Sequence, residues 1–269
     1  MLTLLRVEWL KVKSYRTFWI LLGMTILSIP GLNYLIYSVM NNKFPKPKTG
    51  KSFIGSPFAF PDAWQTVSWN STLLFIIPSI LIITLTTNEF TYKTHRQNII
   101  DGWSRRQFIS VKLFELLLLS IVCALTVFLT AIVFGCVANK LPADVSLWQD
   151  VRFVFFYFVQ MISFSTIAFL MTLLIKRPGL AIAAFLIYML GENIVAGIFQ
   201  HIYKIDAVNY LPEQVTDSLI PQPYLRKLLQ TPAEFTSWEH HIPIYLAVAL
   251  AYLIIYCFVC GKRFTTSDL

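Results

Sequence analysis

Residues 108–137 read FISVKLFELLLLSIVCALTVFLTAIVFGCV. Apart from Lys112 and Glu115, near its start, this stretch carries no charged side chain. A helix needs about 20 mostly apolar residues to cross the hydrocarbon core of a bilayer, so the stretch is long enough to span a membrane. It also lacks the polar face that a surface helix of a soluble protein shows. The sequence therefore predicts an integral membrane protein.

Five further stretches meet the same criterion. The expected spans are residues 17–40, 71–88, 108–137, 151–175, 179–200 and 242–261. Pro30 and Pro78 lie inside the first two spans and should kink them. Only 13% of the 269 residues are charged, against about 25% in a soluble domain. The expected fold class is therefore all-α, with six transmembrane helices in a single membrane domain that covers residues 1–269.

The distribution of lysine and arginine gives the expected orientation. Of the 22 basic residues, 13 lie in the short segments on the side of both termini, and nine lie in longer segments on the other side. Basic residues concentrate in short cytoplasmic loops. Both termini are therefore expected to face the cytoplasm, although four lysines in residues 43–51 weaken the asymmetry. The net charge of +8 then reflects topology in a lipid bilayer, and no nucleic-acid partner is expected.

The N-terminal residues 2–15 are expected to form an amphipathic helix. One helical face would carry Leu2, Leu5, Trp9 and Val12, and the other Arg6 and Lys13. Such a helix lies in the plane of the lipid headgroups, with its basic side toward the anionic cytoplasmic leaflet. Two interpretations stay open: a simple positive anchor for the first span, or an elbow helix that also contacts a cytoplasmic partner.

The connection between the second and third spans, residues 88–112, reads NEFTYKTHRQNIIDGWSRRQFISVK. Asp101 and Gly102 should end a helix, because glycine suits the left-handed residue that follows a helix C-terminus. Ser104 and Gln107 have the spacing of a capping box, which would start the next helix. The pattern predicts a helix, a turn and a second helix that runs into the third span. A cytoplasmic partner could bind such a rigid projection; the alternative is a solvated basic loop.

Together these segments resemble the six-helix permeases of type 2 (ABC-2-type) ATP-binding-cassette exporters, of the bacitracin- and lantibiotic-immunity kind. The N-terminus is similar to the family's Glu-x-x-Lys elbow, present as Glu8 and Lys11. The cytoplasmic segment is similar in Glu89, Thr94, Gly102, Trp103, Ser104, Arg105 and Lys112. The six-span layout also agrees, whereas the large outer segment after the first span departs from the family pattern.

The resemblance implies a transmembrane subunit that forms a translocation pathway as a homodimer or heterodimer with a second permease chain. Two copies of a separate ATPase subunit would bind ATP and magnesium, so this chain would be no enzyme and would hold no cofactor of its own. The coupling segment, residues 89–106, would relay closure of the ATPase subunits, with Glu89 and Arg105 fixing it by charged hydrogen bonds. Its candidate residues are Glu89, Thr94, Gly102, Trp103, Arg105 and Arg106. The resemblance also implies the bacterial cytoplasmic membrane.

Glu192 and Asn193, in the outer half of the fifth span, are the candidate pathway residues. Glu192 lies roughly 22 Å up the helix from Arg177 at about 1.5 Å per residue, and a carboxylate there has to face protein or water. The sequence predicts either an outer gate above a central cavity or a local cap or ion pair near the outer interface. Gly191 and Gly197 would let the span break and turn back there.

Other features of the chain carry less information. His240 and His241 are adjacent and would point apart on a helix, so no metal site is expected. Thr231 and Pro232, with Glu234, predict the start of a short outer helix before the last span. Two other functions stay open: a secondary transporter whose acidic residues carry protons, and a membrane scaffold or sensor that transports nothing. An ATPase subunit encoded beside the chain and co-purifying with it would favour the exporter.

Overall fold

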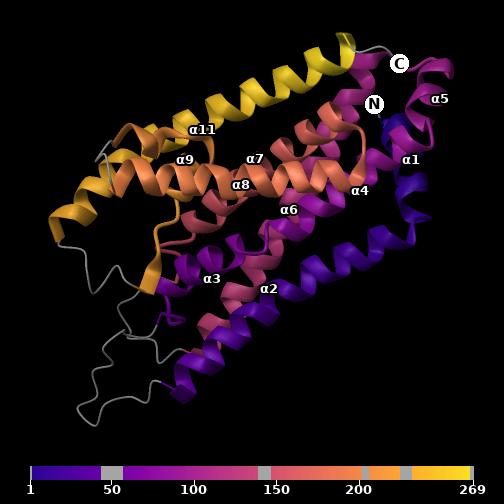
Figure 1. Ribbon diagram of the computed structural model, residues 1–269. Helices are drawn as coiled ribbons and strands as arrows, with labels where there is room; N and C mark the ends of the chain where they lie inside the picture. Colours follow the sequence, from indigo (N-terminus) through magenta and orange to yellow (C-terminus); the bar gives the residue numbers. More distant parts are fainter. Residues whose placement is uncertain (1, 44–56, 139–146, 202–205, 225–231, 267–269) are drawn as a thin grey trace.

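The computed structural model describes residues 2–43, 57–138, 147–201, 206–224 and 232–266, and the regular elements within these ranges are helices (Figure 1). In chain order they are α1 (Leu2–Lys13), α2 (Arg16–Lys43), α3 (Asp62–Thr72), α4 (Ile76–Thr91), α5 (Thr94–Ile100), α6 (Arg105–Ala138), α7 (Arg152–Ile175), α8 (Pro178–His201), the 3₁₀ helix η1 (Asp206–Tyr210), α9 (Pro212–Asp217) and α11 (Pro232–Thr266). The helices α2, α6, α7, α8 and α11 are long and apolar enough to cross a membrane, and α3 with α4 qualifies as one bent pair. The predicted all-α membrane fold is therefore confirmed, with five or six candidate spans.

The second span differs from the expected residues 71–88. Its helix begins at Asp62, as α3, and breaks at residues 73–75, where α3 and α4 meet at an angle of 47°. The third residue of α4, Pro78, explains the break, because its ring would clash with the carbonyl of residue 74 in a continuous helix. The expected kink is therefore present as a break one turn before the proline. A helix thus begins at Asp62, before the expected start at residue 71. The polar sequence of α3 explains the difference, because it resembles a loop although most of its side chains are buried.

Three other expectations concern helix continuity. The helix α2 continues through Pro30, and a kink there stays a prediction. A helix does begin at Pro232, as expected, but α11 then runs unbroken to Thr266, so it forms no separate short outer helix. The expected break in the fifth span is wrong, because α8 continues past Gly191 and Gly197 to His201. A Cβ added at either glycine would meet no described atom of another element within 4 Å, so neither glycine marks a close helix contact.

The central helix of the bundle is α7, which packs against α3, α4, α6, α8, α9 and α11. Within its most apolar window, 67% of the residues are buried inside the protein, against 6% for α11 and 11% for α8. Aromatic rings fill the contact between α7 and the start of α4: Phe75 lies 5.2 Å from Tyr157 and 5.0 Å from Phe164, between ring centroids. The long exposed apolar faces of α2, α8 and α11 are suited to lipid or to a second chain.

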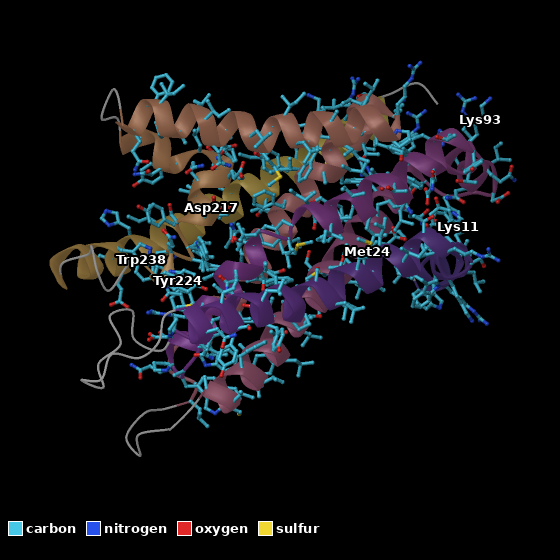
Figure 2. All side chains as sticks on the ribbon, turned by 60° about the horizontal axis from the view of Figure 1, so that its bottom comes forward. Lys11, Met24, Lys93, Asp217, Tyr224 and Trp238 are labelled. Carbon is cyan, nitrogen blue, oxygen red and sulfur yellow. The ribbon has the colours of Figure 1, made fainter. Side chains whose placement is uncertain are left out.

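The two ends of the bundle carry different elements. Figure 1 shows both termini at one end, beside α1 and α5. Figure 2 places Lys11 and Lys93 at this end, called the α5 end below, and Asp217, Tyr224 and Trp238 at the opposite end, called the α9 end. Termini at the same end fit an even number of spans. Several basic residues that entered the orientation count lie outside the described residues: positions 46, 48, 51, 140, 204, 226 and 227.

Candidate functional site

The short helix α5 ends in a turn that the sequence predicted correctly. Gly102 has a left-handed φ of 98°. Its N–H donates to the carbonyl of Ile99 (3.1 Å), and the N–H of Trp103 donates to the carbonyl of Asn98 (3.0 Å). This pair of hydrogen bonds is the Schellman motif, in which glycine avoids the steric cost of the left-handed conformation. The turn therefore closes α5 and gives the carbonyls of Asn98 and Ile99 hydrogen-bond partners.

The expected capping box at the start of α6 is also present. The N–H of Ser104 donates to Oε1 of Gln107 (2.8 Å), and the N–H of Gln107 donates back to Oγ of Ser104 (3.2 Å). Reciprocal bonds of this kind satisfy two donors that a helix start otherwise leaves without partners. The predicted helix–turn–helix is thus confirmed, and the turn between α5 and α6 is fixed at both of its ends.

A buried polar network lies where α1, α4, α5 and α6 meet, and we call it the inner cluster: Glu8, Lys11, Glu89, Asn98, Lys112 and Glu115. Lys112 is its centre, with a side chain that is 3% exposed. Its Nζ donates to Oε2 of Glu8 (2.7 Å), Oε1 of Glu89 (2.6 Å) and Oε2 of Glu115 (3.1 Å). These bonds use all three donors of the ammonium group. Glu115 lies three residues from Lys112 on the same helix, whereas the other two partners come from distant segments.

Lys11 connects α1 to α5 within the same network. Its Nζ donates to Oε1 of Glu8 (2.7 Å) and to Oδ1 of Asn98 (3.0 Å), and it lies 5.6 Å from the ring centroid of Trp103. Burial alone would raise the pKa of Glu8, but the ammonium groups of Lys112 and Lys11 lower that pKa to about 2. Glu8 is therefore ionised, and a buried carboxylate of this kind needs both partners. The Glu-x-x-Lys pair of the N-terminus thus contacts both α5 and α6.

His95, on α5, was not singled out by the sequence. Its Nδ1 lies 2.9 Å from the backbone carbonyl of Glu89, and its ring lies 4.8 Å from that of Phe90, between centroids. Burial lowers the pKa of His95, so the ring is neutral at pH 7 and donates to the carbonyl from a protonated Nδ1. Thr94 reaches the same carbonyl at 3.5 Å. These contacts join the start of α5 to the end of α4. They depend on the bend between the two helices, which the sequence pattern does not describe.

The two arginines that follow the turn have different positions. Arg105 donates from Nη1 to the carbonyl of Thr265 (2.6 Å), which joins the start of α6 to the end of α11. Arg106 is exposed. Glu89 makes its charged hydrogen bond with Lys112. Both expected anchors, Glu89 and Arg105, therefore make charged hydrogen bonds, although to separate partners on α6 and α11.

One face of α5 points away from the inner cluster. Tyr92, just before the helix, is 74% exposed, and Ile100, its last residue, is 77% exposed. Lys93 and Arg96 are exposed between them, and Figure 2 shows Lys93 at the tip of the α5 end. The projection therefore combines a buried, hydrogen-bonded inner face with an exposed outer face that is partly apolar and partly basic.

The second candidate region lies at the α9 end, where Glu192 and Asn193 meet α9. Oε1 of Glu192 accepts hydrogen bonds from the backbone N–H groups of Glu213 (2.5 Å) and Gln214 (3.3 Å). Nδ2 of Asn193 donates to Oε1 of Glu213 (2.7 Å). An anion at the first turn of a helix is favourable, because the free N–H groups and the helix dipole attract it. Glu192 therefore caps α9 through backbone donors in place of a lysine or arginine, and the role of Glu192 and Asn193 in an outer gate stays a prediction.

Two more carboxylates, those of Glu213 and Asp217, lie beside Glu192. We call the whole group the outer cluster: Gln160, Glu192, Asn193, Glu213, Gln214 and Asp217. Gln160, on α7, donates to Asp217. Burial and the neighbouring carboxylates raise the pKa of Glu213 to about 8 and that of Asp217 to about 7. Sequence reasoning missed both residues because it assigned them to an outer loop. The signal that could have found α9 is Pro212 at its first position, followed by Glu213.

The sequence was compared with protein-family models and with curated proteins. The family model for ABC-2 family transporter proteins matches residues 4–192. The chain belongs to the ABC-2 transporter family. It is therefore a permease, a membrane transport subunit that is not itself catalytic, and the ATPase of such a system is a separate subunit. No curated protein matches the sequence. The matched part of the permease includes the whole inner cluster and ends at Glu192.

Proposed function

We propose that this permease is the transmembrane subunit of an ATP-driven ABC exporter in the bacterial cytoplasmic membrane, of the bacitracin- and lantibiotic-immunity kind. It would work as a dimer of permease chains bound to two ATPase subunits, with both termini in the cytoplasm. In this proposal α1 is the elbow helix and α5 is the coupling helix. The observation that carries the proposal is the inner cluster, because one buried ammonium group joins α1, α4 and α6 beside α5.

The geometry around α5 suits the relay of a mechanical push. The start of α5 is bonded to the last turn of α4 through His95, and its end is continuous with the capping box of α6. Asn98, near the middle of α5, accepts from Lys11 of α1. Charge-assisted hydrogen bonds are short and strong, so α5 cannot shift by itself. Movement imposed on α5 would reach the ends of α4 and α6 directly.

The exposed face of α5 is the surface that we assign to the ATPase subunit. Tyr92 and Ile100 supply large apolar contacts at its two ends, and Arg96 adds charge between them. Interfaces typically place aromatic and apolar anchors in pockets of the partner and basic groups around them. We expect a groove with a matching apolar floor and acidic rim on the ATPase subunit.

The test is co-purification of the affinity-tagged permease with the ATPase encoded beside it, followed by measurement of ATP hydrolysis in the reconstituted complex. A permease with both Tyr92→Ala and Ile100→Ala should lose most of the bound ATPase while remaining folded. Leu147→Ala is the matched control, because Leu147 is an exposed apolar residue outside the α5 end. Equal ATPase binding by all three chains would contradict the assignment of α5. Transport that persists without any ATPase and follows a proton gradient would favour a secondary transporter.

We assign the permease dimer to the exposed face of α8, the fifth span. Large apolar side chains of α8 are exposed in steps of seven residues, with Ile187 at 70% and Ile194 at 60%. A seven-residue step keeps side chains on one helix face, as a helix–helix interface requires. Single cysteines at these two positions should cross-link two copies in native membranes if the dimer is homomeric. A cysteine at Leu129, on the exposed face of α6, is the control.

A further inference from the structure

A cavity of about 510 Å³ lies between α1, the first turns of α2, and the adjoining parts of α4 and α6. Its volume is within the range of roughly 300–1,000 Å³ that is usual for small-molecule sites. The lining is mostly apolar and includes Leu22, Leu81, Leu85, Leu119, Val122 and Phe169. Nothing in the proposed coupling mechanism uses this space.

The polar groups of the cavity come from the inner cluster. Glu8, Lys112 and Glu115 line it, together with Thr86 of α4. A cavity with long apolar walls and a few converging polar groups matches the shape of an amphiphile, which has an alkyl chain and a polar head. The charged groups fix which head would fit.

The charges of the inner cluster do not balance. Three carboxylates, those of Glu8, Glu89 and Glu115, face two ammonium groups, those of Lys11 and Lys112. Glu115 makes the longest contact with Lys112, at 3.1 Å, and its side chain is 26% exposed, against 2% for Glu8 and 11% for Glu89. Glu115 is therefore the carboxylate that Lys112 holds least closely, and it lies where the cluster borders the cavity.

The opening of the cavity is suited to a ligand that arrives from the bilayer. Trp9 and Trp19 line it, are 51% and 48% exposed, and lie edge to face with centroids 6.2 Å apart. Nε1 of Trp19 donates to the carbonyl of Lys13, which fixes that ring at the junction of α1 and α2. Tryptophan favours the boundary between lipid headgroups and acyl chains. The mouth thus lies at the depth where the head of a lipid-like molecule resides.

We propose that this cavity binds an amphiphile with one amine headgroup and an alkyl chain, taken up from the surrounding membrane. The ammonium group would contact the carboxylate of Glu115, and the chain would lie along Leu85, Leu119 and Val122. A carboxylate head would add a fourth acid to a cluster that already holds three acids and two amines, and a hydroxyl head would bring no cation to Glu115. The inference depends on the inner cluster and the cavity, and it is independent of the role assigned to α5.

The test uses three photoactivatable probes with the same dodecyl chain: an amine, an alcohol and a carboxylic acid, each with a diazirine at the chain end. The permease is reconstituted in phosphatidylcholine nanodiscs, labelled, and the labelled residues are mapped by mass spectrometry. Saturable labelling of the cavity by the amine, displaced by unlabelled dodecylamine, is the expected result. Glu115→Gln should weaken the amine labelling about tenfold, as for loss of a charged hydrogen bond, and leave alcohol labelling unchanged.

Two variants control for the fold. Glu239→Gln removes a carboxylate that pairs with Arg152 at the exposed start of α7 and should leave all labelling unchanged. Leu119→Trp fills the cavity from its wall and should block the amine and the alcohol alike. If Glu115→Gln does not fold, the comparison of the three probes on the unaltered chain still decides the head preference. Equal labelling by amine and alcohol, preference for the acid, or no saturable labelling would each overturn the proposal.

Discussion

Nζ of Lys112 lies 2.6 Å from Oε1 of Glu89, and both side chains are buried. Lys112 lies on α6 and Glu89 on α4, 23 positions apart in the sequence, and the segment between them contains the whole of α5. Their bond therefore closes a loop around α5 and fixes the two ends of that loop relative to each other. Removing one partner of a buried ion pair lowers the stability of the fold far more than removing one partner of an exposed pair, because the remaining charge stays buried without a partner.

Lys112→Met is therefore expected to destabilise the permease strongly. Glu8 and Glu89 would lose their shared cation, at a cost of about 3–5 kcal/mol, which corresponds to a fall of roughly 10 °C in Tm for a chain of this size. Tryptophan fluorescence in detergent measures the midpoint. Lys93→Met, which removes an exposed lysine next to α5, should leave it within a degree or two. A Lys112→Met chain as stable as the unaltered one would show that the cluster does not hold these helices together.

Gly102→Val tests the turn between α5 and α6. At a φ of 98° a β-branched residue is strained, although the space around the glycine is open among the described atoms. We expect a cost of about 1–3 kcal/mol in this turn, with weaker ATPase binding, or with less transport while basal ATP hydrolysis persists. Gly102→Asn is the matched control, because asparagine tolerates left-handed backbone better. Full transport and full stimulation of the ATPase by the valine variant would mean that the segment is only a connecting loop.

Sequence rules found the features that depend on neighbouring residues. The length of apolar runs located the spans, and the Gly102 turn and the Ser104–Gln107 box follow from residues within one turn of each other. The partners of Lys112 could not be found in this way. Glu8 lies 104 residues away from it, and only the packing of α1 against the bundle brings the two together.

The helix α3 shows the opposite case, in which composition misled. Its two buried amide side chains find partners on other elements: Asn70 donates to Oδ1 of Asn33 on α2 (2.9 Å) and accepts from Tyr224 (2.8 Å). Gln65 donates to the carbonyl of Pro221 (2.7 Å). A buried polar group is tolerated when it is hydrogen-bonded. Hydropathy measures the groups of one segment alone, so it assigned α3 to the outer connection.

The outer cluster predicts a dependence of stability on pH. The pKa of Glu213 rises from its ordinary value of 4.5 to about 8, so the folded chain keeps a proton that the unfolded chain loses above about pH 4.5. The stability of the fold should therefore fall as pH rises from about 4.5 to 8. Above about pH 8 Glu213 is ionised in both states and causes no further loss. Tm measured across this range should show the decline, and Glu213→Gln should reduce it. Glu239→Gln should not reduce it, and equal slopes for all three chains would contradict the prediction.

Orientation in the membrane can be tested with single cysteines. From the sequence, Lys48 and Thr231 would be outer positions for such cysteines and Arg105 an inner one. Lys48 and Thr231 lie outside the described residues, and a cysteine in place of Arg105 would remove its hydrogen bond to Thr265. Gln222 and Arg96 are exposed at the α9 and α5 ends. In a chain without its native cysteines, an impermeant maleimide should label Gln222→Cys in whole cells and Arg96→Cys only after permeabilisation. Labelling of Arg96→Cys in intact cells would reverse the orientation and remove the basis for coupling.

Glu192→Gln separates a gate from a cap at the α9 end. The glutamine keeps an oxygen that can accept from the N–H groups of Glu213 and Gln214 but removes the charge beside two other carboxylates. Loss of the charge–dipole attraction costs about 0.3–1 kcal/mol, and the relief of repulsion offsets it, so Tm should hardly change. If the charge serves the outer gate, ATP hydrolysis by the reconstituted complex and transport should change.

Glu192→Ala completes the comparison, because alanine accepts no hydrogen bond and removes the cap as well as the charge. Loss of a helix cap costs about 1 kcal/mol, so this variant should lower Tm by a few degrees. A gate predicts that glutamine and alanine alter transport alike while only alanine alters stability. A purely structural cap predicts that glutamine behaves as the unaltered chain in transport and that the alanine defect follows its loss of stability. The gate assignment fails if glutamine leaves transport intact or if it unfolds the complex, since the charge would then be irrelevant to the pathway or required for the fold itself.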